Sequence, residues 1–148
     1  MEHIGFPRGQ LNSSMLLPMI IISMIAALLS TMNVWVDNLS DIRFHLNDVY
    51  MAILMTSWMV LLDAIYRGNV TVAAIGLVCV GVTIYMIRNQ TFISDCQFVK
   101  GMIPHHSMAV RMAREIKNKT KDHKIAILAD DIIKSQNSEI SLMKSWGY

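Results

Sequence analysis

Three apolar stretches, each long enough to cross a lipid bilayer, constrain this chain more than any other feature. The first runs over residues 15–36 without a charged side chain. At a rise of about 1.5 Å per residue, a helix of that length covers roughly 33 Å, enough to cross the hydrocarbon layer. The other two run over about 49–66 and 70–87. The sequence therefore predicts an all-α protein in which residues 1–90 form a membrane domain with three transmembrane helices.

The first stretch has an alternative interpretation as a cleaved signal peptide, because a short segment containing Arg8 precedes it. Its apolar run is longer than the core of a usual signal peptide, and small residues are poorly placed for cleavage after Leu28-Leu29-Ser30. We therefore expect a retained membrane anchor.

The second and third stretches are separated only by Arg67-Gly68-Asn69, which predicts a tight turn and an antiparallel helical hairpin. Gly76 and Gly81 in the third stretch would let a neighbouring backbone approach closely. Asp63 is the acidic residue within these spans. We expect it to pair with Arg67 four residues later, the alternative being a functional role at membrane depth.

Methionines recur at four-residue spacing in the second stretch, at Met51, Met55 and Met59. Helix packing is the favoured interpretation, because the flexible thioether side chain fills irregular contacts. Passage of Cu(I) along the stripe is the alternative, since thioethers suit that ion.

Charged residues are concentrated in the last third of the chain. Residues 89–148 contain nine Lys/Arg and six acidic residues, whereas residues 1–88 contain four and five. The resulting charges of +3 and −1 sum to the chain's +2, which is too mild to indicate nucleic-acid binding. The sequence thus predicts a separate polar domain over residues 91–148.

This polar domain has the signals of two helices. Ser94-Asp95-Cys96-Gln97 fits a capping box that begins the first helix, and the polar run 117–121 interrupts its apolar pattern. Asp122 is a natural N-cap for a second helix over about 123–146, which Gly147 would end. Because two helices alone bury little surface, the pair should pack against a second copy, the membrane helices or a metal. A homodimer or higher homo-oligomer that forms a four-helix bundle is the simplest solution.

The adjacent histidines His105 and His106 are the residues that point most directly to chemistry, because imidazole is the commonest metal ligand. At about 100° per residue, one helix face of roughly 160° gathers both imidazoles with thioethers and a carboxylate. Imidazole and thioether together suit copper, particularly Cu(I). Pro104 predicts a kink or a new helix start beside them. The alternative is that the pair begins a helix and bonds to its backbone while the methionines fill the core. The other members of the face are Met102, Met108, Met112 and Asp95.

Together these positions resemble one family over roughly residues 91–146. The matching segments are Asp95-x-x-Phe98, Met102-Ile103-Pro104-His105-His106, Ala109-x-x-Met112-Ala113 and the spaced residues from Ala129 through Gln136 and Glu139 to Met143 and Trp146. The family is the domain-of-unknown-function family numbered three hundred and five, which includes CopM-like copper-binding proteins. The resemblance implies a ferritin-like helical bundle, often periplasmic, that binds copper through His and Met. The positions that match as metal ligands are His105, His106, Met102, Met112 and Met143, with Asp95 and Gln136 in support.

Soluble members of that family commonly carry two copies of the motif, whereas this chain carries one, so a homodimer would have to supply the second. We expect a membrane-anchored protein that binds a copper ion, Cu(I) or Cu(II), for sequestration, resistance or delivery to a copper-handling partner. The alternative is a structural or assembly subunit of a membrane complex. No enzyme is expected, because the Glu-x-x-His pairs of di-iron bundles and other catalytic motifs are missing from the sequence.

The expected location is the inner or plasma membrane, with the C-terminal domain on the periplasmic or extracellular side. The positive-inside count is close to a tie, so this orientation rests on the acid-rich first loop, with Asp37, Asp41 and Asp48, and on the metal hypothesis.

Overall fold

The structure, a computed structural model, describes residues 13–147. Within this range the chain is all-helical, as predicted, and forms no strand. Arg8, which supported the alternative of a cleaved signal peptide, lies outside the described residues. The elements, in chain order, are α1 (Ser13–Leu29), the 3-10 turns η1 (Met32–Trp35) and η2 (Leu39–Asp41), α2 (Leu46–Arg67), α3 (Val70–Arg88), α4 (Asp95–Lys119) and α5 (His123–Ser145).

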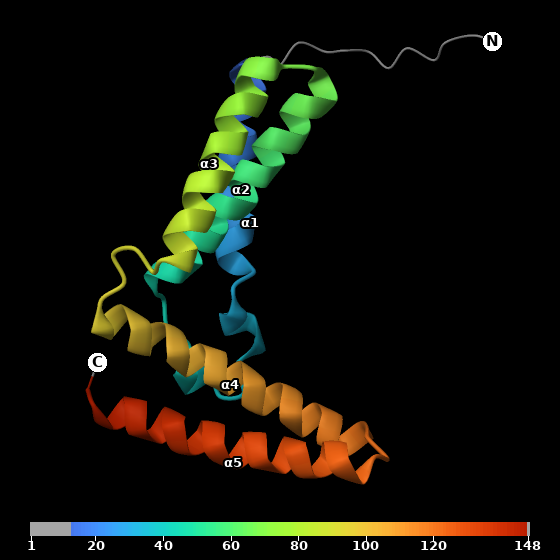
Figure 1. The fold of residues 1–148 in the computed structure, drawn as a ribbon, viewed down its shortest axis with the longest axis vertical. Coiled ribbons are helices and arrows are strands. Elements are labelled where there is room, and N and C mark those ends of the chain that lie inside the picture. Colours follow the sequence, from blue (N-terminus) through green and yellow to red (C-terminus); the bar gives the residue numbers. More distant parts are fainter. Residues whose placement is uncertain (1–12, 148) are drawn as a thin grey trace, which may run out of the picture. The chain divides into compact units, whose positions relative to one another are not determined.

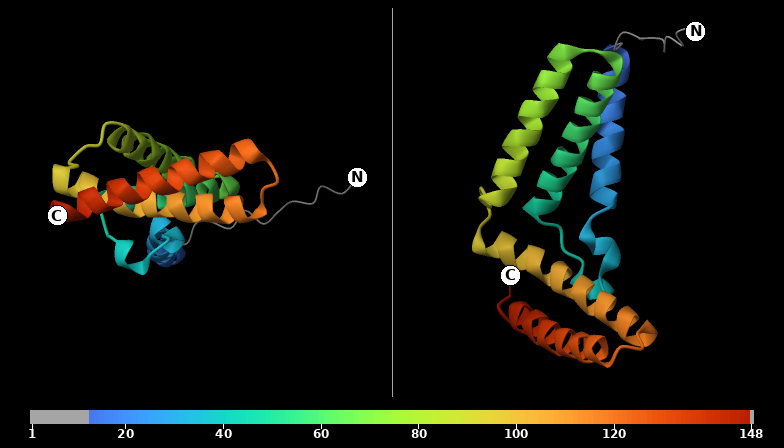
Figure 2. Two further views of the ribbon diagram at one scale, coloured as in Figure 1. Left: turned by 90° about the horizontal axis from the view of Figure 1, so that it is seen from below. Right: turned by 45° about the vertical axis from the view of Figure 1, so that its right-hand side comes forward.

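The chain divides into two compact units. The apolar unit comprises described residues 13–29 and Val49–Thr91, and in it α1, α2 and α3 lie side by side (Figures 1 and 2). The hairpin unit comprises Ser30–Asp48 and residues 92–147, and in it α4 and α5 pack as an antiparallel pair. We call its first segment, Ser30–Asp48, the strap. The domain boundary predicted at residue 90 stays a prediction. It assigns the strap to the membrane domain, whereas the strap packs with the hairpin.

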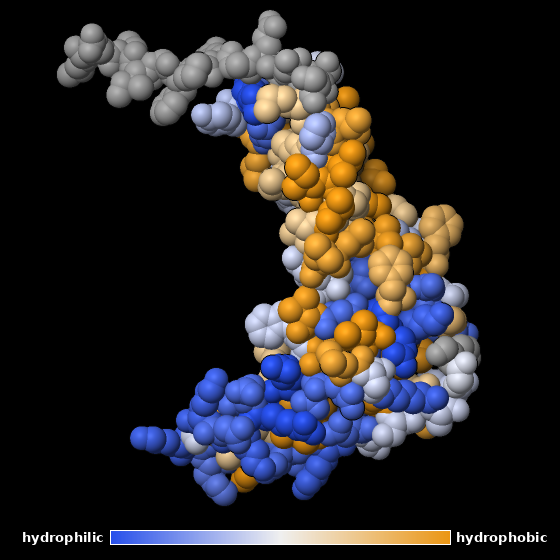
Figure 3. Space-filling model, turned by 180° about the vertical axis from the view of Figure 1, so that it is seen from behind, coloured by the Kyte–Doolittle hydropathy of each residue, from blue (hydrophilic) through white to orange (hydrophobic). Residues whose placement is uncertain are grey.

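Within residues 13–147, three stretches are long and apolar enough to cross a membrane: Met15–Trp35, Leu46–Arg67 and Val70–Arg88. Figure 3 shows hydrophobic side chains gathered over the apolar unit and mostly hydrophilic ones over the hairpin unit. Most of the large hydrophobic residues of α1 and α3 are exposed rather than packed inside the unit. An outer surface of this kind matches a lipid environment, in which apolar side chains face outward.

The first span differs from its prediction, because its α-helix ends at Leu29 instead of continuing to Val36. Seven residues of the expected helix belong to the strap, and Val36 is buried in the hairpin unit. Asn33 explains part of the change. Its amide donates to the Arg43 carbonyl (2.9 Å) and its oxygen accepts from the Arg43 N–H (3.1 Å). Such side-chain bonds to backbone compete with helix formation and here join the two arms of the strap.

The predicted turn between α2 and α3 is confirmed. Gly68 has a φ of +72°, which favours glycine, and the Asn69 side chain caps α3 by accepting from the Val72 N–H (3.1 Å). Of the two glycines expected at close contacts, only Gly76 lies at one: a Cβ there would be 3.0 Å from the Leu61 Cα. The expectation for Gly81 is wrong, because a Cβ at that position would meet nothing within 4 Å.

This contrast gives a matched pair of substitutions. We expect Gly76→Ala to loosen the α2–α3 packing, because the Leu61 backbone must move, at a destabilisation of about 1–3 kcal/mol. Gly81→Ala should be neutral or stabilise by up to about 1 kcal/mol, since alanine favours helix. Thermal unfolding of both variants in the same detergent tests the pair. Equal melting temperatures would contradict the close contact.

Two further predictions about α2 can be compared with the structure. Asp63 pairs with Arg67, whose Nε lies 2.9 Å from a carboxylate oxygen, so the expected pairing is confirmed. The three methionines of the stripe, Met51, Met55 and Met59, are each about half exposed. They therefore line an outward face of α2 rather than the interior of the unit.

The hairpin begins and ends where the sequence predicts. Ser94 accepts from the Gln97 N–H (3.4 Å), Asp122 accepts from the Lys124 N–H (2.8 Å), and Gly147 follows α5 with a φ of +74°. The side chain of Gln97 does not complete a capping box: its oxygen accepts from the Leu46 N–H (2.8 Å) in the strap.

Pro104 neither ends α4 nor begins a new helix, because the α-helix is continuous from Asp95 to Lys119. The missing N–H of Pro104 is tolerated because α4 packs against both α5 and the strap. The core between α4 and α5 consists of Val99, Ile103, Val110, Ile140 and Met143, with Met102 and Ile133 packed against it.

Candidate metal-binding site

The two adjacent histidines lie in the middle of α4. Their ring centroids are 5.8 Å apart and the rings are tilted by 59°. His105 is exposed, whereas His106 retains only 12% of its side-chain exposure. Residues that follow one another on a helix point about 100° apart, so only one of the pair can face α5. That residue is His106.

A carboxylate on α5 meets the buried imidazole. The Nδ1 of His106 lies 2.9 Å from Oε2 of Glu139, although the contact is not directed as a well-aligned hydrogen bond. Burial lowers the pKa of His106, Glu139 raises it, and the neighbouring His105 lowers it, with a net decrease. His106 is therefore held as a neutral imidazole near neutral pH, the form that binds metal. The resemblance gave Gln136 a supporting role, and the structure places Glu139 against His106.

The sulfur ligands predicted from the sequence lie in different surroundings. Met143 is buried in the core and Met102 packs against it, so both thioethers lie between α4 and α5. Met112 is more than half exposed and lines an apolar groove nearer the α4–α5 turn. Asp95 lies ten residues before His105, about 15 Å away along the helix axis, beside Phe98 and Trp146.

Within one chain, then, the fold brings His106 together with Glu139, and it does not bring Asp95 to the histidines. Among residues 13–147 no three His, Cys, Asp or Glu side chains gather as a group able to hold a metal. The ligand set as a whole stays a prediction. A metal bound here would need thioether sulfur, or donors from a second chain, to complete its coordination.

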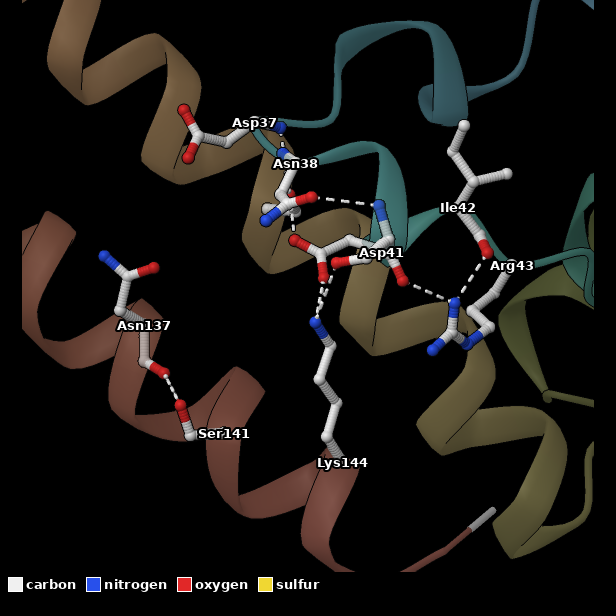
Figure 4. A network of polar contacts seen from close by, with 10 residues as sticks. Asp37, Asn38, Asp41, Ile42, Arg43, Asn137, Ser141 and Lys144 are labelled. Atoms are coloured by element: carbon white, nitrogen blue, oxygen red, sulfur yellow. Dashed lines mark hydrogen bonds and ion pairs between the residues drawn. The ribbon is translucent and has the colours of Figure 1, made fainter.

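The strap is held on α4 and α5 by a buried hydroxyl group and by ion pairs, contacts that residue spacing does not predict. Ser107 on α4 is fully buried, accepts from the Asp37 N–H (2.9 Å) and donates to Oδ2 of Asp41 (2.7 Å). The ammonium group of Lys144 on α5 pairs with the other oxygen of Asp41 (Figure 4). Arg114 pairs with both oxygens of Asp37 (2.7 and 2.9 Å). The acids Asp37 and Asp41, which sequence reasoning used only for orientation, thus hold the strap on α4 and α5.

His45, also in the strap, is a second buried imidazole and was missed from the sequence. It is 2% exposed, and its Nε2 lies 3.4 Å from Oδ1 of Asp48. Its ring lies against α4 at Gly101, where a Cβ would be 3.4 Å from Nδ1. Burial lowers the pKa of His45, and the attraction of Asp48 opposes this only in part. A lone histidine in a loop, without a motif around it, carries no sequence signal for this position.

Both buried histidines make the stability of the hairpin unit depend on pH. Their pKa values are lowered from the ordinary value of 6.5, so the unfolded chain takes up protons first as the pH falls. Stability should be complete above about pH 6.5 and decline below it, by at most about 1.4 kcal/mol per pH unit for each histidine. Melting temperatures at about pH 7.5 and about pH 5.5 measure this loss. We expect His45→Gln to reduce the difference and the exposed control His123→Gln to leave it unchanged. An undiminished difference in the His45 variant would contradict the assignment.

The fold and the site define a class: a protein with three apolar helices of membrane-spanning length and a helical hairpin that carries a His-His pair. The family model described as a domain of unknown function, DUF305, matches residues 87–147. The chain belongs to this family, and the resemblance seen in its motifs is confirmed.

A protein of Acanthamoeba polyphaga mimivirus, described only as uncharacterized, is similar along nearly the whole chain. The two are 46% identical over 140 residues, which cover 91% of this chain and 92% of the relative. The similarity therefore includes the apolar helices as well as the hairpin. No solved structure matches the chain.

Proposed function

We propose that this protein binds copper through its hairpin unit while its three apolar helices anchor it in a membrane. The observation that carries the proposal is the contact between His106 and Glu139. A carboxylate that accepts the N–H of one ring nitrogen fixes the tautomer and orientation of an imidazole and leaves the other nitrogen to the metal, and Glu139 lies close enough to Nδ1 of His106 for this role. His105 beside it and the thioether of Met102 one turn earlier supply the imidazole and sulfur donors that copper, particularly Cu(I), prefers.

The second part of the proposal is that two chains share the site. One chain supplies two histidines and few other donors, so a homodimer would complete the coordination. The hairpin leaves an apolar groove of about 450 Å³ between α4 and α5, which a second helix pair could fill to form a four-helix bundle. The groove is lined by Ala109, Met112, Ala113, Ile116, Ile125, Leu128, Ala129 and Ile132.

We also propose that the protein lies in an inner or plasma membrane, with the hairpin on the periplasmic or extracellular side. Sequestration, resistance and delivery to a copper-handling protein are the roles such a site would serve. The length and hydropathy of the three spans support membrane insertion.

Competition for Cu(I) between the purified full-length protein and a chromophoric chelator tests the proposal. We expect tight, saturable uptake of Cu(I) and much weaker uptake of Zn(II), because thioethers are poor ligands for zinc. Size measurement with and without copper would report whether two chains share an ion. Absence of Cu(I) uptake at micromolar protein would refute the function.

A second candidate function is a structural subunit of a membrane complex, and the same apolar groove favours it, since a partner helix would also fill it. The two candidates differ in their response to chelators. A complex held by the groove should survive copper removal, whereas one that shares copper ligands should weaken.

A further inference from the structure

The chain passes between its two units three times, and an exposed aromatic residue lies close to each passage. Trp35 follows the end of α1 by six residues, Phe44 precedes the start of α2 by two, and Phe92 follows the end of α3 by four. Their exposed fractions are 58%, 67% and 81%. Each ring thus lies within six residues of an end of an apolar helix, the position at which membrane proteins are enriched in aromatic side chains.

A membrane crossed by the apolar helices would place the three residues near one of its two surfaces. The apolar helices run alternately up and down, so the end of α1, the start of α2 and the end of α3 lie at the same end of the apolar unit (Figures 1 and 2). The first apolar span runs from Met15 to Trp35, so it continues for six residues past the end of α1 at Leu29 and ends at one of these aromatic residues.

The link from α3 to α4 carries one of these exposed aromatic residues on a strained backbone. Gln90 and Phe92 both have positive φ, 48° and 60°, a conformation that is unfavourable for residues other than glycine. Tyr50 of α2 secures this link, because its hydroxyl donates to the Thr91 carbonyl (2.6 Å). In this link the Phe92 ring is exposed.

We propose that Trp35, Phe44 and Phe92 insert into the headgroup region of the bilayer and form an interfacial anchor for the hairpin unit. Aromatic rings prefer this depth, and Arg43 and Arg88, next to two of the passages, suit the lipid phosphates. The strap thereby has two roles: Asp37 and Asp41 bind α4 and α5, while its aromatic residues bind lipid. This inference rests on the membrane insertion proposed above.

Tryptophan fluorescence of the full-length protein in lipid nanodiscs tests the anchor, because the chain has three tryptophans in different places. The double variant Trp58→Phe/Trp146→Phe retains only Trp35, and Trp35→Phe/Trp146→Phe retains only Trp58, near the middle of α2. Lipids brominated near the headgroup or near the chain end quench tryptophans at those depths. We expect Trp35 to be quenched about twofold by the shallow lipid and little by aqueous iodide. Trp58 should respond more to the deep lipid.

The outcomes separate the two proposals. If Trp58 is quenched by lipid while Trp35 responds only to iodide, the anchor is refuted and membrane insertion stands. If neither is quenched by lipid, insertion and the anchor both fail. One side of Trp35 lies beside Arg111 and Ile116 of α4, so a second probe is needed. Phe44→Trp in a chain whose three native tryptophans are replaced by Phe should give the same shallow quenching, and iodide quenching there would count against the anchor.

Discussion

The double variant His105→Ala/His106→Ala should lose high-affinity copper binding while keeping its fold. Loss of two imidazole ligands typically weakens metal affinity far more than loss of a supporting group, for which about 10–100-fold is usual. We therefore expect a decrease of more than about 100-fold in Cu(I) affinity. Chelator competition on the full-length protein measures it. Helix content should change little, because His105 is exposed and alanine favours helix.

Two controls sharpen this experiment. His123→Ala removes an exposed histidine from the same hairpin and should leave copper affinity unchanged. Glu139→Gln keeps the size of the side chain but removes the charge beside His106, and we expect a decrease of about 10–100-fold. Unchanged affinity in the double variant would exclude the histidine site, and an equal loss in the His123 variant would indicate a nonspecific effect.

The second large effect should come from Asp41→Ala in the strap. Asp41 is almost fully buried and joins Ser107 to Lys144, so its loss leaves the Ser107 hydroxyl without its acceptor and the Lys144 ammonium group with the Ser40 hydroxyl in place of a carboxylate. Breaking a buried pair costs about 3–5 kcal/mol. Because the Lys144 side chain is 35% exposed, water can replace part of the interaction, and we expect about 2 kcal/mol. Chemical unfolding measures the total, and amide hydrogen exchange at Asp37 and Asn38 shows whether the strap opens first.

Asp130→Ala is the matched control for this substitution. It removes a carboxylate from the Lys117–Asp130 pair, whose side chains are both more than 40% exposed, so the expected loss is below about 1 kcal/mol. Equal destabilisation by the two variants would mean that the strap contributes no more to stability than a surface ion pair.

Local sequence signals predicted the helices well where a cap or a turn marks their ends. Ser94, Asp122 and Gly147 are positioned by backbone bonds within a few residues, so the pattern alone was sufficient. The end of α1 was missed because its cause is not local: Asn33 bonds to Arg43, ten residues away. Hydropathy continues past Leu29 and gives no sign of that contact.

In the candidate site, too, features set by local contacts were predicted and features set by distant segments were not. The motif on α4 indicated His106, and its pairing with Glu139 follows from the contact between two helices. Ser107 and His45 were not identified from the sequence. Ser107 acquires its role because the strap covers it, and His45 because the strap, to which it belongs, packs against α4. Burial of polar groups by distant segments cannot be read from residue spacing.

The strap covers parts of the two C-terminal helices through Val36, His45 and Asp41. The hairpin therefore cannot be expressed without the strap and keep the same surface. A fragment of residues 92–147 expressed without the preceding sequence would uncover the Ser107 hydroxyl and the Gly101 surface, and it would lack the carboxylate that neutralises Lys144. Such a fragment would be a different molecule, prone to associate through surfaces that the intact chain keeps closed.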